Sequence, residues 1–415
     1  MGPVAAQFLA DLGADVIAVE PPDGAFQRKW GGADKRVDGQ SMLLLTGNRN
    51  KRSLTLDLKK PEAIEIARKL IATSDVMTEN FRPGVLDKLG LGYEDAKKIN
   101  PQIIYAAASG YGPDGPYVYR PGQDLLVQAI SGLATITGSR EQGPRAVGVS
   151  AVDHHGAALF AAGILAALVR KTPGQGCRVD VSLLSAALDL QMESFTCYLN
   201  GERPDDVRQP GPISGWYYGA PYGIYPTRDG HMAISLGSLS TVSEALDVPA
   251  DQRVPDKEAY RRRDEASAAI AANVAKRTTA ECIALFEAHG IWHAAVNDYA
   301  DVVTDPQVVH NKNCRSSAGR RARRSRSSAI PCAMMASCPK SDCRLRNLGL
   351  RPRKSSKSSA TTTTNLKTFP GRGRSAPLRP RAPLDDAPNA HHGRHARAHV
   401  HTGHARDDRA EADSP

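Results

Sequence analysis

The spacing of apolar residues in the first 200 positions alternates between a helical and a strand period. Residues 3–12 carry Val4, Phe8 and Leu12 at spacings of four, which predicts a helix that starts at Pro3. Gly13 ends this helix, and the apolar run 14–20 (ADVIAVE) is typical of a buried strand.

The same alternation recurs further along the chain. We expect helices from Pro61, over 93–98 and over 153–170, and strands over 75–79, 103–109 and 178–183. Helices that alternate with apolar strands favour an α/β fold, with a doubly wound parallel sheet covered on both faces. This predicts a large domain over residues 1–199. The chain begins on a helix with no strand before it, so we expect the natural sequence to start further upstream.

The pattern changes near residue 200. Residues 200–240 are rich in Gly, Pro and Tyr, and predicted helices over 257–276 and 279–289 precede a strand over 291–296. We expect a smaller α+β domain over 200–300 and a return linker over 301–313.

Charge separates the chain into two parts at about residue 313. The whole chain has a formal net charge of +10, but residues 314–415 hold 22 Lys and Arg against 7 Asp and Glu. The preceding residues are therefore acidic. The basic segment has a single aromatic residue, Phe369, and few β-branched aliphatic residues to bury, so we expect a disordered tail.

Several classes of protein do not fit this sequence. The longest apolar stretch, 156–169, falls short of the ~20 residues of a membrane span and is typical of a buried helix. The start lacks the basic residues of a secretory signal. Cys177, Cys197 and Cys282 are scattered, which favours a reducing, cytoplasmic setting and no metal site. In the tail, neither Cys332, Cys338 and Cys343 nor the histidines of 391–404 have the spacing of a metal site.

Residues 110–115 (GYGPDG) match the glycine pattern of dinucleotide-binding loops and follow a predicted strand. That fingerprint needs a helix directly after the glycines, whereas Pro116 and a Tyr-rich segment follow here. A glycine-rich turn is the better interpretation.

Basic and amide groups lie near predicted strand ends, where open α/β sheets bind ligands. They belong to Arg28, residues 48–52 (NRNKR) and residues 80–84 (NFRPG). Such groups suit phosphates, although each is also compatible with a solvated surface.

Asp153 is the most informative acidic residue, because it precedes the long apolar helix. One interpretation is an N-cap, whose carboxylate accepts the free N–H groups of the first turn. The other is a carboxylate nucleophile held at a helix N-terminus. The pattern alone leaves both open, and they require different side-chain directions.

Five segments together give the chain a resemblance to the class III coenzyme A transferases, the group of formyl-CoA transferase and carnitine CoA-transferase. They occur in the family's order and at about its spacing: 5–22 (AAQFLADLGADVIAVEPP), 50–57 (NKRSLTLD), 79–84 (ENFRPG), 109–116 (SGYGPDGP) and 174–184 (GQGCRVDVSLL). The resemblance implies a large doubly wound domain, a small domain and an interlocked homodimer.

The resemblance also implies a chemistry. Family members transfer CoA from an acyl-CoA donor to a carboxylic acid, and their catalytic Asp corresponds to Asp153, which would form covalent aspartyl intermediates. By position, Arg28, Asn80, Phe81, Lys88 and Arg120 match places that hold CoA. The CoA thioester is a substrate, and no permanent cofactor or metal is implied.

The family also contains α-methylacyl-CoA racemases, which use a His and the Asp. Where racemases have Gly-His-Asp, this chain has Gly122-Gln123-Asp124, and an amide is no general base. His154 and His155 beside Asp153 keep this alternative open.

Two departures from the family stand out. The strand and loop that usually precede Gly2-Pro3 are absent, and the likeness stops soon after residue 308, where the basic segment begins. We expect either a frameshift or a natural basic tail. A natural tail would bind nucleic acid or acidic surfaces non-specifically, and the chain would then act as a basic nucleic-acid-binding protein. Because fold elements are missing at both ends, the chain is alternatively an inactive fragment.

Overall fold

The computed structural model describes residues 1–37, 39–170, 172–204, 206–208, 211–317 and 328–331. By their contacts, these described residues belong to one compact unit. We describe first its parallel strands and their helices, and then its antiparallel strands.

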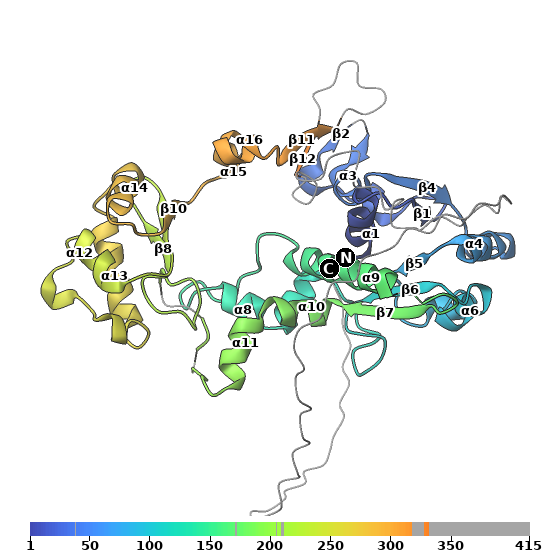
Figure 1. The fold of residues 1–415 in the computed structure, drawn as a ribbon, viewed down its shortest axis with the longest axis horizontal. Helices are drawn as coiled ribbons and strands as arrows, with labels where there is room; N and C mark the ends of the chain where they lie inside the picture. The colour runs from blue at the N-terminus through green and yellow to red at the C-terminus, as the bar shows by residue number, and fades with distance from the viewer. Residues whose placement is uncertain (38, 171, 205, 209–210, 318–327, 332–415) are drawn as a thin grey trace, which may run out of the picture. The chain divides into compact units, whose positions relative to one another are not determined.

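The parallel strands form two separate sheets (Figure 1). β1 (Val16–Glu20) pairs with β4 (Lys51–Thr55), while β5 (Val76–Glu79), β6 (Ile104–Ser109) and β7 (Cys177–Ser182) pair in that order. The strands lie where the apolar runs predicted them, and their parallel pairing is confirmed. The prediction of one continuous sheet is wrong in the described residues, because the backbone hydrogen bonds of β1 and β4 do not extend to β5.

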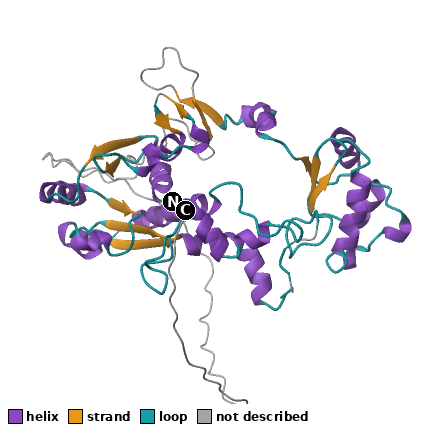
Figure 2. Ribbon diagram, turned by 180° about the vertical axis from the view of Figure 1, so that it is seen from behind, coloured by secondary structure: helices purple, strands orange, loops and turns teal. Residues whose placement is uncertain are grey.

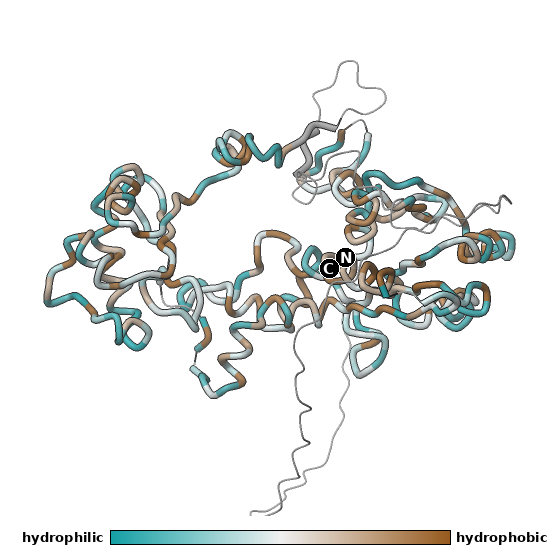
Figure 3. The backbone as a smooth tube through the Cα atoms, in the orientation of Figure 1, coloured by the Kyte–Doolittle hydropathy of each residue, from teal (hydrophilic) through white to brown (hydrophobic). Residues whose placement is uncertain are grey.

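Helices cover both faces of the three-stranded sheet. On one face, α1 (Gly2–Asp11) and α9 (Ala151–Arg170) pack with Ala106, Ala108 and Phe160 in a buried cluster. On the other face, α4 (Pro61–Thr73) and α6 (Tyr93–Ile99) pack with Ile103 and Tyr105. Alternate residues of β6 thus enter opposite cores, as the period of a strand requires. Figure 3 shows the long hydrophobic stretch of α9.

Shorter elements connect these layers. They are α2 (Phe26–Lys29), β2 (Arg36–Val37), β3 (Gln40–Ser41), α3 (Met42–Asn48), α5 (Val85–Lys88), α7 (Asp124–Ile130), α8 (Leu133–Thr137), α10 (Leu183–Leu190) and α11 (Met192–Leu199), with a 3₁₀ turn at Gly32–Asp34. The apolar pattern did not predict them, since most are too short to show a period.

Residues 213–295 hold an antiparallel sheet and three helices (Figure 2). β8 (Gly223–Pro226), β9 (His231–Ile234) and β10 (His293–Ala295) pair in the order β10-β9-β8. Buried Tyr225, Met232 and Phe286 share a core with α12 (Leu239–Ala245), α13 (Arg263–Val274) and α14 (Thr279–Ala288). The helix predicted over 257–276 is shorter, because 3₁₀ turns at Ala250–Gln252 and Asp256–Glu258 precede it.

The segment after residue 298 contains α15 (Tyr299–Thr304), α16 (Pro306–His310), β11 (Cys314–Ser317) and β12 (Ser328–Pro331). β11 and β12 pair antiparallel within the segment for which disorder was predicted, and the disordered tail over 314–415 stays a prediction. A backbone ladder forms without the large apolar side chains on which that prediction relied. The rest of the predicted tail, with Cys332, Cys338, Cys343 and the histidines of 391–404, lies outside the described residues.

Among the described residues, α9 is the one helix long and apolar enough to cross a membrane by length and composition. Its 20 residues exceed the 14 of the apolar stretch identified in the sequence. Phe160 and Ile164 are fully buried against β6, β7 and α1. α9 therefore packs as a core helix of the α/β part.

Candidate functional site

Asp153 lies in the first turn of α9, at the third helical position. Its carboxylate Oδ1 accepts a hydrogen bond from the α-amino group of Met1 at 2.7 Å, and its side chain is 32% exposed. Its backbone N–H donates to Oδ2 of Asp124 at 2.9 Å. The N-cap interpretation of Asp153 is therefore wrong: the helix begins two residues earlier, and another carboxylate serves its N–H group.

Met1 lies between α1 and α9. A Cβ built on Gly156 would approach the Met1 sulfur to 2.6 Å, so the Met1 side chain would have to shift to make room for any larger residue there. A Cβ built on Gly2 would lie 3.2 Å from Cβ of Asn80. The start of α1 therefore borders both Asp153 and Asn80, two of the residues that the sequence singled out.

Phe81 and Lys88 follow the carboxyl end of β5. The carboxylate of Glu79 accepts the backbone N–H of Phe81 at 2.7 Å, which fixes the turn after the strand. Phe81 is 48% exposed, and Lys88 is exposed at the end of α5. The turn thus presents an aromatic ring and a cation at the edge where parallel sheets bind ligands.

Glu79 and Phe81 also line a cavity of about 140 Å³, together with residues from β6, β7, α5 and α6: Asp87, Tyr93, Tyr105, Ser109, Arg178 and Asp180 among them. Burial raises the pKa of Glu79 to about 7, against the Phe81 hydrogen bond and Arg178, which lower it. Burial likewise raises the pKa of Tyr105. Arg178 is paired with Asp180 at 2.9 Å.

Arg28 is engaged within the chain. Its Nε and terminal nitrogen donate to the two carboxylate oxygens of Glu20 at 2.5 and 2.6 Å. The hydrogen bond from Arg28 lowers the pKa of Glu20 to about 2, with further contributions from Ser53 and the N–H of Ala25. The pairing orients the guanidinium at the carboxyl end of β1 and compensates most of its charge. A role for Arg28 in holding CoA stays a prediction.

The basic residues of 48–52 also have partners inside the chain. Arg49 pairs with Asp11, and Arg52 pairs with Asp15 at 2.8 Å. The Lys51 ammonium donates to the carbonyls of Pro3 and Gly47 at 2.7 and 2.8 Å, and burial lowers its pKa to about 8. These groups fasten β4 to α1 and α3, so the phosphate-binding interpretation of this segment finds no support in its contacts.

Arg120 belongs to a loop that closes on itself. The Cα atoms at the ends of residues 110–122 approach so closely that a Cβ on Gly110 would lie 2.7 Å from Cα of Gly122. Within the loop, the Arg120 guanidinium stacks at 4.0 Å from the ring centroid of Tyr117. The next helix, α7, begins only at Asp124, so this segment lacks the helix of the dinucleotide fingerprint, as the sequence predicted.

Asp124 and Glu79 are the residues at this site that the sequence did not single out. Asp124 was noted only as part of Gly122-Gln123-Asp124, and its contact with residue 153 spans 29 positions. No short sequence pattern predicts a contact between positions so far apart. Glu79 was noted only as the first residue of ENFRPG, whereas its half-buried state depends on β6 and β7.

The two histidines next to Asp153 do not form a proton-transfer pair with it in the structure. His155 Nε2 lies 2.7 Å from Oδ2 of Asp189 on α10, and His154 is exposed. Residues one and two positions apart on a helix point in different directions. The racemase alternative therefore gains no support from these side chains.

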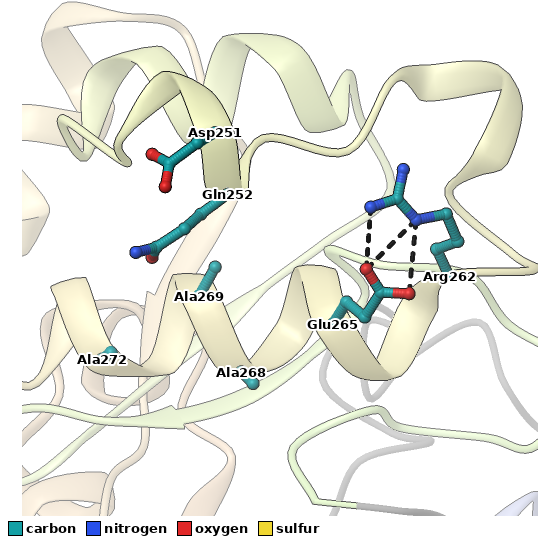
Figure 4. A pocket seen from close by; sticks show the side chains of 7 residues that line it. All are labelled: Asp251, Gln252, Arg262, Glu265, Ala268, Ala269 and Ala272. Atoms are coloured by element: carbon teal, nitrogen blue, oxygen red, sulfur yellow. Dashed lines mark hydrogen bonds and ion pairs between the residues drawn. The ribbon is translucent and has the colours of Figure 1, made fainter.

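Two other features of the described residues bear on ligand binding. Within the described ranges, no three His, Cys, Asp or Glu side chains gather as a metal site would require. A second cavity, of about 400 Å³, lies beside α13 (Figure 4). Its floor consists of Ala268, Ala269 and Ala272, and its charged pair, Arg262 and Glu265, is joined at 2.7 Å. None of the predicted site residues lines it.

Comparison with known proteins decides the family. The model of CoA-transferase family III matches residues 1–340. The chain belongs to CoA-transferase family III. The match runs beyond residue 308, so the prediction that the likeness stops there is wrong.

Two relatives illustrate the activities found in this family. The chain is 36% identical to succinyl-CoA:glutarate CoA-transferase of Mus musculus over 323 residues, which is 75% of this chain and 72% of the relative. It is 32% identical to acetyl-CoA:oxalate CoA-transferase of Acetobacter aceti, over 77% of this chain and 82% of the relative.

The fold agrees with a solved family III structure. A CaiB/BaiF family protein from Brucella suis superposes with a TM-score of 0.67 and 30% identity, covering 79% of this chain and 90% of that one. The mixed α/β architecture with parallel sheets is therefore the family's fold.

Proposed function

We propose that this chain transfers coenzyme A from an acyl-CoA donor to a carboxylic acid acceptor, with Asp153 as the nucleophile. The observation that carries the proposal is the state of the Asp153 carboxylate. It is partly exposed, lies in the first turn of α9, and is not used to cap that helix. The helix dipole attracts a carboxylate at a helix N-terminus, and a carboxylate oxygen that is not used as a cap can act as a nucleophile.

The reaction proceeds through successive acyl-transfer steps. A carboxylate oxygen of Asp153 attacks the thioester carbonyl, the C–S bond breaks, and CoA leaves as the thiolate. The thiolate then attacks the Asp153 carbonyl of the mixed anhydride and releases the donor carboxylate. The acceptor carboxylate attacks the resulting aspartyl-CoA thioester and again displaces the thiolate. Attack of the thiolate on the acceptor's acyl group yields the new acyl-CoA and restores Asp153.

Residues at the carboxyl ends of β1, β5 and β6 would hold the CoA part. Asn80 lies beside the start of α1, which also borders Asp153, and Phe81 and Lys88 follow it in the same connection. Lys88 offers a point charge for phosphate, and Phe81 an exposed ring. Arg28 and Arg120 would add guanidinium groups held by Glu20 and Tyr117.

For the acceptor we propose a short dicarboxylic acid, because the mouse relative is named for succinyl-CoA and glutarate and the Acetobacter relative for acetyl-CoA and oxalate. We further propose a homodimer as the active form. Exposed apolar side chains on α7 and α10–α11 favour it: Leu125, Leu126, Leu188, Leu190, Met192 and Leu199. Light scattering coupled to size exclusion measures this directly.

The experiment that tests the function is an exchange assay. Succinyl-CoA and acetyl-CoA serve as donors, glutarate and oxalate as acceptors, and radiolabelled CoA reports transfer. Wild-type protein should catalyse exchange, and Asp153→Asn should lower the rate at least about a thousandfold. Exchange at the wild-type rate in Asp153→Asn would refute the proposal.

A further inference from the structure

Asp124 connects three segments that are far apart in the sequence. It is the first residue of α7, and its Oδ2 accepts the backbone N–H of Asp153 at 2.9 Å. Its other oxygen accepts a hydrogen bond from the side-chain amide of Gln128, one turn along the same helix. Both carboxylate oxygens are thus used inside the chain.

Gln128 extends this connection to the segment before α9. Its side chain is almost fully buried, at 2% exposure. Its Oε1 accepts the backbone N–H of Val147 at 2.9 Å, and its Nε2 lies 3.5 Å from the carbonyl of Val149. Asp124 and Gln128 therefore bind both the loop that enters α9 and the first turn of that helix.

This arrangement has a consequence for Asp153. The first N–H groups of a helix lack partners within the helix, and an acidic side chain in the first turn is a natural acceptor for them. Because Asp124 accepts the N–H of residue 153, the Asp153 carboxylate need not turn back to its own backbone. It accepts instead from the amino group of Met1, outside the helix.

From these contacts we propose that Asp124, supported by Gln128, is a positioning residue for the CoA-transfer reaction. It fixes the first turn of α9 so that the Asp153 carboxylate faces the acyl group. The inference rests on the proposed function of Asp153. Asp124 acts through hydrogen-bond geometry and exchanges no proton with the substrate.

Substitutions can exchange donor and acceptor in the hydrogen bond between positions 124 and 128. This separates the effect of the hydrogen-bond geometry from that of the negative charge on Asp124. In Asp124→Asn, the amide oxygen still accepts from residue 153, but the amide nitrogen opposes the Gln128 amide, so two donors face each other. In the double variant Asp124→Asn/Gln128→Glu, the carboxylate introduced at position 128 accepts from both the amide introduced at position 124 and the Val147 N–H. All bonds are then restored except the long contact with Val149, and the negative charge has moved from position 124 to position 128.

The test measures kcat and KM for succinyl-CoA with glutarate, alongside melting temperature. Asp124→Asn should lower kcat about ten- to hundredfold with KM changed less than about threefold, because a misplaced nucleophile reacts slowly while CoA still binds. The double variant should recover kcat to within about threefold of wild type. Asp153→Asn in the same assay separates the two proposals, since its full activity would refute the nucleophile itself.

Three results would overturn the inference: unchanged kcat in Asp124→Asn, a loss confined to KM, or a folded double variant as slow as the single one. If the double variant does not fold, Gln128→Met replaces it, because it breaks the bonds to Asp124 and Val147 without adding charge. It should lower kcat and leave KM unchanged, and wild-type kcat in a folded Gln128→Met protein would also overturn the inference.

Discussion

The guanidinium of Arg28 forms a two-point ion pair with the carboxylate of Glu20, at 2.5 and 2.6 Å. Glu20 is the last residue of β1 and is buried, while Arg28 lies eight positions later in α2. The pair fixes a cation at the carboxyl end of β1. It therefore couples the stability of this edge to the proposed recognition of CoA.

Glu20→Gln tests that coupling. The pKa of Glu20 is depressed to about 2, so its ionised form stabilises the fold at pH values above about 4.5, and this stabilisation is lost as the pH falls through 2. We expect the variant to lose about 2 kcal/mol of unfolding free energy at pH 7 and much less near pH 2.5. Urea unfolding at the two pH values measures this.

Arg28→Lys addresses recognition. An ammonium cannot form the two-point bond, so we expect KM for acyl-CoA to rise about tenfold while kcat changes little. Exposed Lys59→Arg is the matched control and should leave both constants unchanged. A wild-type KM in Arg28→Lys would remove Arg28 from the proposed CoA site.

Glu79 should also make the free energy of unfolding depend on pH, with a sign opposite to that of Glu20. Its pKa is raised to about 7 by burial, so the folded state holds a proton that the unfolded state releases near pH 4.5. Stability from this group is present below pH 4.5 and falls as the pH rises through 7. Glu79→Gln keeps the oxygen that accepts from Phe81, and should raise unfolding free energy at pH 8 by about 1 kcal/mol, since water screens the exposed part.

The comparison for Glu79→Gln is exposed Glu141→Gln, measured by urea unfolding at pH 5 and pH 8. Only Glu79→Gln should flatten the difference between the two pH values. An equal effect of both substitutions would attribute the pH dependence to net charge instead.

Lys51 provides a further prediction about stability. Its ammonium contacts the carbonyls of Pro3 and Gly47 and the Asn48 side chain at 2.7 to 3.0 Å. Lys51→Met leaves these acceptors without a donor, so we expect a loss of about 1–3 kcal/mol in unfolding free energy at pH 7. Exposed Lys69→Met should cost less than about 0.5 kcal/mol.

The lowered pKa of Lys51 also determines whether its contribution to stability rises or falls with pH. Because it is lowered to about 8, the unfolded chain binds more protons than the folded chain between pH 8 and about 10, and this contribution to stability rises with pH. The rise should disappear in Lys51→Met. Its persistence there would assign it to another group.

The close approach between the two ends of the loop over residues 110–122 supplies another prediction. A Cβ on Gly110 would lie 2.7 Å from the Cα of Gly122, and backbone cannot yield as a flexible side chain does. Gly110→Ala should therefore cost more than about 2 kcal/mol and displace α7 with Asp124. Gly237→Ala, which meets open space, is the control and should be close to neutral. Equal melting temperatures for both variants would contradict this account of the loop.

The sequence predicted those parts of the fold that have a regular apolar period. The strands 16–20 and 104–109 and the helices from Pro61 and over 279–288 lie where their patterns placed them. What it missed depends on contacts between distant positions. Examples are the separation of β1–β4 from β5–β6–β7 and the pairing of β11 with β12.

The candidate site shows the same division. Asp153 and the residues after β5 stand in short motifs and could be named from the sequence. The hydrogen-bond partners of these groups could not be predicted from the motifs. The acceptor for the Asp153 N–H lies at position 124, and the partner of Arg28 is Glu20. The N-cap interpretation failed for this reason: the local pattern around Asp153 contains no sign of Asp124.

The most direct test of the account is to trap the covalent intermediate. Wild-type protein is incubated with succinyl-CoA, treated with hydroxylamine, and digested for peptide mass spectrometry. An aspartyl-CoA thioester or aspartyl anhydride would be converted to a hydroxamate, and we predict this modification at Asp153, dependent on succinyl-CoA and absent in Asp153→Asn. Turnover of succinyl-CoA and glutarate by wild-type protein with no hydroxamate at Asp153, or with one at another carboxylate, would contradict the account.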